Sequence, residues 1–105
     1  MTNIAVAFDA LGDSTRRTVF ERLRRGPRSV GELAKGLPVS RPAVSQHLRI
    51  LKDARLVRDR AIGNRRLYSV DPTGLEAMKT YLDQFWTQAL DAFKAAAERT
   101  PTEEA

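Results

Sequence analysis

The chain of 105 residues contains no cysteine. Disulfide bonds, thiolate metal sites and thiol redox sensing are therefore excluded by composition. No apolar run approaches the roughly 18 residues needed to span a membrane, and the N-terminus lacks the basic start and long apolar core of a signal peptide. We therefore expect a cytoplasmic protein with no membrane partner.

Histidine is almost as scarce, because His47 is the only one. A metal site needs several clustered ligands, and general acid–base catalysis needs a positioned partner and a pocket. His47 falls about 60° from the centre of an apolar helix stripe, a position typical of packing or of a local hydrogen bond. The sequence predicts no metal, no cofactor and no catalytic residue, and an enzyme is the weakest of the functional hypotheses.

Positive charge is abundant, but only in the first part of the chain. Residues 1–66 hold 15 Lys and Arg against 6 Asp and Glu, a net charge of +9, whereas residues 67–105 hold 3 against 7, a net charge of −4. A localised basic surface indicates a polyanionic partner, and no basic amphipathic helix carries the aromatic and leucine face that would favour a membrane. We expect nucleic acid to bind one domain, residues 1–99, which a flexible tail follows at residues 100–105.

Residues 40–57 are predicted to form one amphipathic helix that contacts the nucleic acid. Val44, Leu48 and Leu51 follow helical spacing and define an apolar stripe that faces the core. The other side carries hydroxyl, amide and guanidinium groups without the Glu/Lys alternation of a merely solvated face, and such groups suit base edges in a major groove. This polar side and its flanks comprise Ser40, Arg41, Pro42, Ser45, Gln46, Arg49 and Asp53.

Two helices are predicted at the start of the chain. The first repeats apolar residues from Ile4 to Leu11 and ends at Gly12, and the second runs from an N-cap at residues 13–15 to about Arg25. Arginines cluster at the end of the second helix, where cations complement the helix dipole and equally suit phosphate contact. Both interpretations stay open for Arg22, Arg24, Arg25 and Arg28.

A helix-turn-helix follows these two helices. Ser29 and Glu32 have the spacing of a capping box, which begins a third helix of fewer than about ten residues. Ser40 is the next N-cap, and Pro42 lies in the first turn, where its missing amide hydrogen costs nothing. Two helices with a short Gly-containing connection and a polar outer face on the second form this motif. We expect the backbone amides of Ser29 and Val30 to face a phosphate.

After residue 57 the hydrophobic period changes from 3.6 to 2. Residues 57–62 and 65–70 are predicted strands, with a hairpin turn at Gly63-Asn64. A two-stranded hairpin is marginal alone, so it must lie against the helices as a wing. Guanidinium groups crowded at its tip repel one another, which favours phosphate or minor-groove contact over a plain solvated turn. The predicted contacts are Arg60, Asn64, Arg65 and Arg66.

The last predicted helix begins at Asp71-Pro72, with Asp as N-cap and Pro at the first position. A helix of about 25 residues measures about 38 Å, which is longer than so small a domain can cover. We predict that it forms a homodimer interface with the first helix, and the alternative is a helix that wraps its own monomer. The predicted interface comprises Ile4, Phe8, Leu11, Leu75, Met78, Leu82, Phe85, Trp86, Leu90 and Phe93.

With these elements in this order, the sequence resembles the ArsR family of bacterial winged-helix repressors over nearly its whole length. The resemblance rests on LGDSTR at residues 11–16, VGELA at 30–34, VSRPAVSQHL at 39–48 and LKDARLV at 51–57. It implies a winged helix-turn-helix fold, mainly α with a small β-hairpin in the order α-α-α-α-β-β-α. It also implies a homodimeric repressor, paired through its first and last helices, on an inverted repeat near its own promoter.

The sequence departs from the family pattern in two places. Metal-sensing members carry Cys in or near the third helix, or His and carboxylate ligands on the last helix; this chain has Ala34-Lys35-Gly36 at the third helix and no His on the last helix. Direct metal sensing is therefore not expected. The family usually has Gly where Arg55 stands, a position suited to a left-handed helix end. Arg would cost on the order of 1 kcal/mol there, and we hypothesise that a phosphate contact retains it.

The sequence thus predicts a sequence-specific, dimeric transcriptional repressor that binds double-stranded DNA. Gln46 is expected to read a base edge, adenine being the usual partner of an amide, while Arg41 and Arg49 contact guanine or phosphate. The rival hypothesis is a winged-helix module that binds a protein or RNA without palindromic DNA specificity. The inducing signal stays open: a small hydrophobic ligand, a partner protein, or none.

Overall fold

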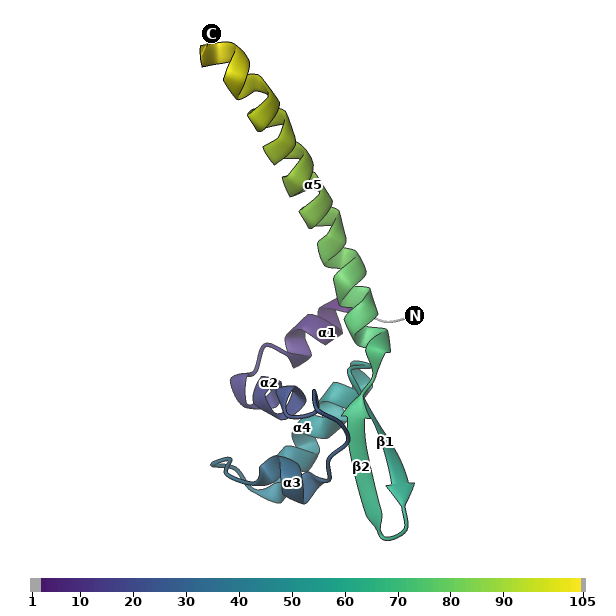
Figure 1. The fold of residues 1–105 in the computed structure, drawn as a ribbon. Coiled ribbons are helices and arrows are strands. Elements are labelled where there is room, and N and C mark those ends of the chain that lie inside the picture. The colour runs from purple at the N-terminus through teal and green to yellow at the C-terminus, as the bar shows by residue number, and fades with distance from the viewer. Residues whose placement is uncertain (1–2, 105) are drawn as a thin grey trace.

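The computed structural model describes residues 3–104, and side-chain surroundings as far as residue 99. It has the predicted order of elements, so the winged helix-turn-helix class is confirmed (Figure 1). The elements are α1 (Ile4–Ala10), α2 (Ser14–Glu21), α3 (Val30–Ala34), α4 (Arg41–Asp53), β1 (Val57–Ile62), β2 (Arg65–Val70) and α5 (Pro72–Glu104).

Side-chain caps decide where the helices begin. The Asp13 and Ser40 side chains accept hydrogen bonds from backbone amides in the first turns of α2 and α4. Ser29 and Glu32 form the predicted capping box of α3, in which each side chain binds the other residue's amide. Asp71 Oδ1 accepts the amide of Thr73 at 3.0 Å at the start of α5. These contacts satisfy amides that have no partner inside their helices.

The core forms around one face of α4. Val44, Leu48 and Leu51 are fully buried, as their spacing predicts. The helices α1, α2 and α3 pack against this stripe, and β1 joins it through Val57. The other fully or almost fully buried residues are Ala7, Ala10, Val19, Leu23, Leu33, Ala54 and Leu56.

The wing is held by a third segment that the sequence analysis did not predict. β1 and β2 pair antiparallel, with Val57 opposite Val70 and Ile62 opposite Arg65. The connection between α2 and α3 then pairs with β2, since the Arg28 amide donates to the Tyr68 carbonyl at 2.9 Å and the Tyr68 amide donates back at 2.8 Å. This isolated bridge attaches the hairpin to the helical domain.

Three helix ends differ from the predictions. α2 ends at Glu21 rather than near Arg25, and residues 22–25 continue as turns. α4 ends at Asp53, short of residue 57, because Arg55 has a φ of +62° and turns the chain out of the helix. α5 continues to Glu104, so residues 100–104, which were expected to form a tail, are helical. The flexibility of that segment, and thus the domain boundary at residue 99, stays a prediction.

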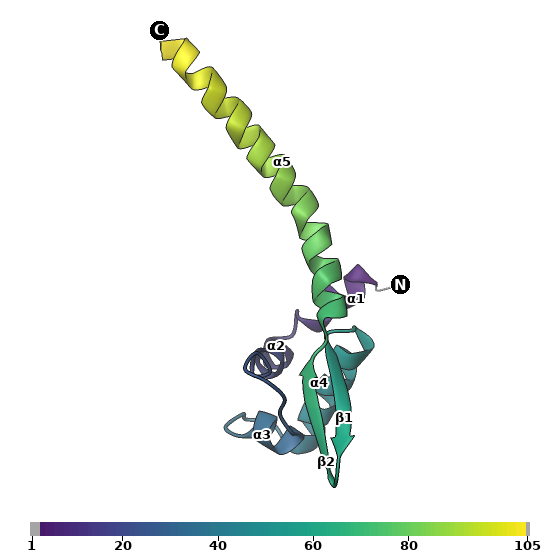
Figure 2. The same ribbon diagram turned by 45° about the vertical axis from the view of Figure 1, so that its right-hand side comes forward.

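The helix α5 projects far from the other elements (Figures 1 and 2). The molecule measures 71 × 31 × 22 Å, and its long dimension follows this helix. α1 packs against the first turns of α5, where the ring of Tyr81 lies 5.7 Å from Phe8 and 5.1 Å from Phe85 in edge-to-face geometry. Trp86 and Phe93, farther along, are 64% and 75% exposed. α5 therefore does not wrap its own monomer, which was the alternative to a dimer.

The end of α4 and the start of α5 meet at Arg55. Its left-handed conformation, foreseen from the glycine that the family usually has there, directs the Arg55 carbonyl oxygen to the Gly74 amide at 2.7 Å. Gly74 is buried, and a Cβ added to it would lie 2.6 Å from that oxygen. The helices α4 and α5 are therefore joined by a close backbone contact at which position 74 has room only for glycine.

We expect Arg55→Gly to raise the free energy of unfolding by about 1 kcal/mol, because glycine adopts a positive φ without the strain of a Cβ. Urea unfolding followed by circular dichroism measures the change. Arg49→Gly, inside α4, is the matched control and should lower stability by about 1 kcal/mol. An Arg55→Gly protein no more stable than the wild type would contradict a strained backbone at this position.

Candidate nucleic-acid interface

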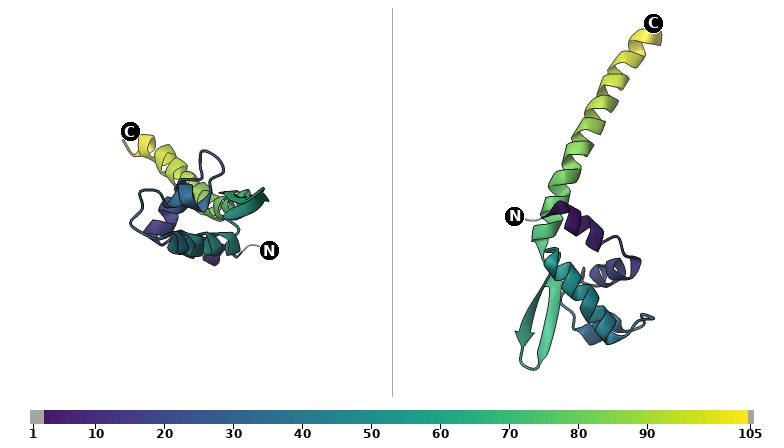
Figure 3. Two further views of the ribbon diagram at one scale, coloured as in Figure 1. Left: turned by 90° about the horizontal axis from the view of Figure 1, so that it is seen from below. Right: turned by 180° about the vertical axis from the view of Figure 1, so that it is seen from behind.

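The outer face of α4 presents polar groups that have no partner within the protein. Pro42, Ser45, Gln46 and Arg49 are all exposed. Their side chains form no hydrogen bond or ion pair with any residue between 3 and 99. Figure 3 (right) shows this helix on the near side of the domain, next to the hairpin. These four residues, all predicted to lie at the DNA, are therefore close together and are free to bind another molecule.

Two residues at the start of α4 also serve the fold. The Ser40 Oγ accepts the Ala43 amide at 3.3 Å, so its acceptor capacity is partly used as a cap. The Arg41 guanidinium lies over α3, where a Cβ added to Gly31 would come within 3.0 Å of its Nη2. The absent side chain of Gly31 thus leaves the space in which Arg41 rests between the two helices of the motif.

At the start of α3, the structure corrects the prediction that the backbone amides of both Ser29 and Val30 face a phosphate. The Ser29 amide donates to Glu32 Oε1 at 2.9 Å and is therefore already used by the capping box. The pKa of Glu32 lies below its ordinary value because it accepts hydrogen bonds from Ser29, first from the backbone amide, and because Arg65 and Arg28 are close by. Val30, at the first helical position, keeps an amide without an intrahelical partner. Only Val30 retains the amide that was expected to face a phosphate.

The expectation of uncompensated crowding at the wing tip is wrong. Arg65 forms an ion pair with Glu32 of α3 at 3.2 Å, and Arg66 forms one with Asp59 of β1 at 2.8 Å. Repulsion between guanidinium groups is offset because each of these two has a carboxylate partner. Asn64 remains exposed in the turn between the strands.

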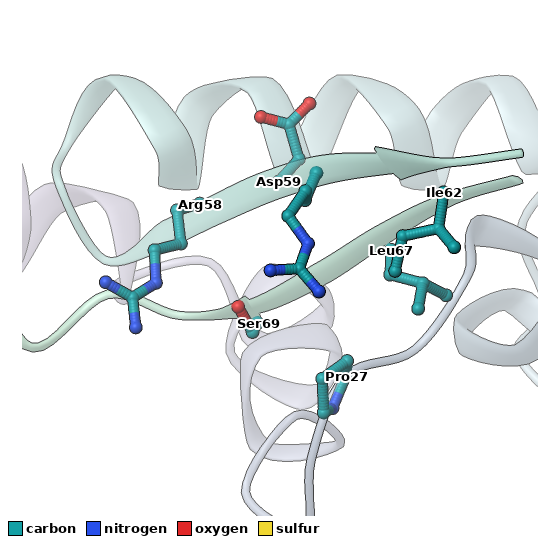
Figure 4. A pocket seen from close by; sticks show the side chains of 7 residues that line it. Pro27, Arg58, Asp59, Ile62, Leu67 and Ser69 are labelled. Atoms are coloured by element: carbon teal, nitrogen blue, oxygen red, sulfur yellow. The ribbon is translucent and has the colours of Figure 1, made fainter.

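Arg60 lies on the opposite face of the hairpin from Arg66, because Arg60 pairs with Leu67 whereas Arg66 pairs with Ala61. It lines a hollow of about 310 Å³ together with Pro27, Arg58 and Leu67. Figure 4 shows the Asp59 carboxylate pointing to one side of the strands and the side chains of Arg58, Leu67 and Ser69 to the other. The four predicted wing contacts are therefore divided between two faces of the hairpin.

A polar groove of about 510 Å³ separates α4 from the wing. It contains two of the predicted DNA-binding residues of α4, Ser45 and Arg49, beside Lys52 and the predicted wing contact Arg66. The full lining is Ser45, Leu48, Arg49, Lys52, Asp53, Asp59, Arg66 and Tyr68.

Asp59, in the floor of this groove, was missed by the sequence analysis. Its side chain is 11% exposed, with Oδ1 2.8 Å from Lys52 Nζ and Oδ2 2.8 Å from Arg66 Nη1. The hydrogen bond from Lys52, and then that from Arg66, hold its pKa below the ordinary value against the opposing effect of burial. Its position in the predicted strand could have identified it, because Asp59 lies two residues after the buried Val57 and therefore on the same face of the strand. On this face Asp59 pairs with Tyr68.

Arg22, in the arginine cluster, has a structural role. Its Nη1 donates to the carbonyl oxygens of Leu33 at 3.0 Å and Lys35 at 2.6 Å, at the end of α3. Arg24 and Arg25 are exposed and line a hollow of about 360 Å³. Arg22 therefore complements the end of α3 and not that of its own helix α2, to which the dipole interpretation had assigned it.

His47 is half-buried, and its Nδ1 is a buried atom without a hydrogen-bond partner in the described structure. It thus lies at the edge of the core, as predicted. Among residues 3–99, whose side chains the structure describes, no group of three or more His, Asp or Glu side chains could hold a metal ion. In the same range, none of the helices combines the length and apolarity required to cross a membrane.

Arg55, the last of the predicted contacts, faces the start of α5. The pKa of Asp71 is lowered, chiefly by the hydrogen bond from the Thr73 amide and further by the charges of Arg58 and Arg55. Arg55 is exposed there. Its hypothesised phosphate contact stays a prediction.

The predicted dimer residues form one apolar surface over α1 and α5. Ile4, Phe8, Leu11 and Met78 are half-buried between these helices and the core. Six others are 38–75% exposed along α5. They are Leu75, Leu82, Phe85, Trp86, Leu90 and Phe93.

Comparison with known proteins gives consistent matches. Residues 13–59 match the family described as bacterial regulatory protein, arsR family. The chain is 63% identical to the HTH-type transcriptional regulator Rv2034 of Mycobacterium tuberculosis over 83% of this chain and 81% of that protein. It is 36% identical to the transcriptional repressor SdpR of Bacillus subtilis, over 66% and 77% of the two chains. A crystal structure of a possible transcriptional regulator for arsenical resistance superposes with a TM-score of 0.70 at 39% identity, covering 86% and 94%.

The lowered pKa of Asp59 predicts a pH dependence. Because the folded-state pKa lies below the ordinary 3.8, the carboxylate's stabilising contribution is complete above the unfolded-state pKa and is lost as the pH falls through the folded-state value. We expect the difference in unfolding free energy between wild type and Asp59→Asn to be constant above about pH 5 and to shrink below 3.8. Urea titrations across this range measure it. The exposed Asp91→Asn is the control, and a pH-independent difference for Asp59→Asn would refute the assignment.

Proposed function

The chain belongs to the ArsR family of bacterial transcriptional regulators, and we propose that it is a dimeric repressor that binds an inverted repeat of duplex DNA at promoters, including its own. The observation that carries this proposal is the outer face of α4, where Gln46 and Arg49 are exposed and have no partner within the described chain. Free amide and guanidinium groups in one row on a helix match the donors and acceptors of base edges.

In this proposal α4 lies in the major groove. Gln46 hydrogen-bonds a base edge, with adenine as the matching partner, while Arg41 and Arg49 contact guanine or phosphate. Ser45 and Pro42 pack at the groove edge. The half-buried position of His47 keeps it out of the contact and supports Gln46 as the residue that reads sequence.

Backbone contacts flank the recognition helix. Arg65 and Asn64 at the wing tip contact phosphates on one side, and the Val30 amide does so at the start of α3. The Arg65–Glu32 pair is 3.2 Å long with both side chains at least half exposed, so exchanging Glu32 for a phosphate costs little. Arg60, on the hairpin face opposite Arg66, reaches only a phosphate outside the major groove that α4 occupies.

A second copy of the chain covers the apolar face of α5. Exposed apolar surfaces of this extent usually mark partner sites, and α1 extends the surface beside it. Pairing two copies presents two α4 helices, which would meet half-sites about 10 base pairs apart on one face of the duplex. Two-fold symmetry of the protein then demands an inverted repeat.

A repressor acts on DNA, so the proposal also places the protein in the cytoplasm, where the bacterial DNA is. The proposed function needs no catalytic residue, cofactor or metal.

The competing hypothesis is a winged-helix module that binds RNA or a protein. Selection of bound duplexes from a random pool, followed by footprinting, separates the two hypotheses, because only the repressor enriches a palindrome. Enrichment of no duplex sequence would reject the proposal.

On the selected duplex, Gln46→Ala should cost about 1 to 3 kcal/mol of binding free energy and relax preference at one base pair of each half-site. Arg65→Ala is the matched control on the backbone. It should weaken all sequences alike and reduce the slope of log K against log salt by about one. Binding measured by fluorescence anisotropy across single-base variants gives both results. An unchanged sequence preference in Gln46→Ala would remove this residue from the interface.

Dimerisation has its own test on α5. Phe93→Glu places a charge in the apolar face, and sedimentation velocity should show the dimer shifted to monomer with the helical circular dichroism of the domain retained. Gln84→Glu is the control, since it lies about 180° around the same helix from Phe93. Equal effects of the two variants, or a wild type that is monomeric at micromolar concentration, would contradict the proposed interface.

A further inference from the structure

Asp59 occupies an unusual position between the recognition helix and the wing. It is the least exposed of the paired carboxylates, with a side chain 11% exposed, whereas Lys52 and Arg66 are each 54% exposed. Each carboxylate oxygen lies 2.8 Å from one cation, so both oxygens are used. Lys52 belongs to α4 and Arg66 to β2, and Asp59 therefore connects the two elements that flank the groove.

The position of this cluster relates it to DNA binding. Its three residues line the same groove as Ser45 and Arg49, which belong to the proposed base-reading face. A phosphate entering the groove would have to compete with a nearly buried carboxylate for Lys52 and Arg66. It would also approach a negative charge that lies close to both cations.

A second ion pair in the interface provides a comparison. Arg65 and Glu32 are 3.2 Å apart, with side chains 62% and 50% exposed. Exposed pairs of this kind contribute at most about 1 kcal/mol and exchange readily. The pairs of Asp59 are shorter and share one nearly buried partner, so they hold their cations more firmly. The interface thus has one arginine that is easily released at the tip and two cations that are retained in the groove.

We propose that Asp59 is a specificity-determining residue, which keeps Lys52 and Arg66 from binding phosphates of non-cognate DNA and so widens the gap between cognate and non-cognate affinity. This inference rests on the proposed function, because it assigns a task to one residue of the same interface. Specificity is a difference of affinities, and a carboxylate that weakens the sequence-independent part of binding increases that difference. Asp59 acts through the two cations and is a positioning residue that need not touch a base.

Asp59→Asn tests the proposal with a nearly isosteric side chain. It should release both cations, and each new phosphate contact steepens the slope of log K against log salt by about 0.9. On a non-cognate duplex the slope should therefore steepen by about 0.9 to 1.8, with affinity raised on the order of tenfold at low salt. The ratio of cognate to non-cognate affinity should fall. Asp59→Glu, which keeps the carboxylate, should retain most of the wild-type ratio.

Glu32→Gln is the matched control for charge. It removes one negative charge from the same interface, and Gln also suits the third position of a capping box, so the start of α3 is preserved. Any general gain from lower negative charge appears in both variants, but the loss of the affinity ratio should appear only in Asp59→Asn. Adding Arg66→Gln to Asp59→Asn should reverse about half of the steepening.

Arg66→Gln alone provides a test that does not depend on the folding of Asp59→Asn. Arg66 was predicted from the sequence to contact DNA, and the present proposal replaces that prediction: if Asp59 retains Arg66, this variant should leave the salt slope on non-cognate DNA unchanged. A slope shallower by about 0.9 would show that Arg66 already binds phosphate in the wild type, and the proposal would be wrong. An unchanged slope in a folded Asp59→Asn protein would equally overturn it. A wild type that prefers no duplex sequence would instead reject the proposed function, which separates the two failures.

Discussion

The burial of one stripe of α4 is the constraint from which the rest of the structure follows. Val44, Leu48 and Leu51 are fully buried, and each such side chain contributes about 1.5 to 3 kcal/mol. This exceeds what an exposed ion pair supplies, so burial decides how the helix is rotated. Because a helix has 3.6 residues per turn, the same rotation turns Gln46 and Arg49 outward. The surface proposed to read DNA is thus a geometric consequence of the core.

The fold gives several charged side chains specific partners, which the net excess of basic residues does not reveal. Two carboxylates, Glu32 and Asp59, each hold an arginine of the wing, and they differ in exposure and in distance to it. Arg22 is used inside the domain, at the carbonyl oxygens that end α3. The basic surface therefore contains groups with different freedom to meet a phosphate, and this difference is the basis for assigning Asp59 a role in specificity.

The helices α4 and α5 are connected by a direct backbone hydrogen bond. Arg55 ends α4 in a left-handed conformation, and its carbonyl oxygen binds the Gly74 amide in the first turn of α5 at 2.7 Å. The exposed aromatic residues of α5, with Phe93 75% exposed, lie beyond this junction. In the proposed dimer, the packing of two α5 helices would therefore set the separation of the two α4 helices, because this backbone contact joins the end of α4 to the start of α5.

The sequence by itself determined the features that depend on near neighbours. The caps at Ser29 and Ser40 and the buried stripe of α4 follow from residues within about one helical turn. The positive φ of Arg55 was expected only from the glycine that the family usually has at this position. Only the tertiary structure decided the partners of the charged groups. Arg65 meets Glu32 across 33 positions, and Asp59 joins α4 to the wing. Such pairs depend on how elements pack, and no local periodicity encodes which of several arginines faces which carboxylate.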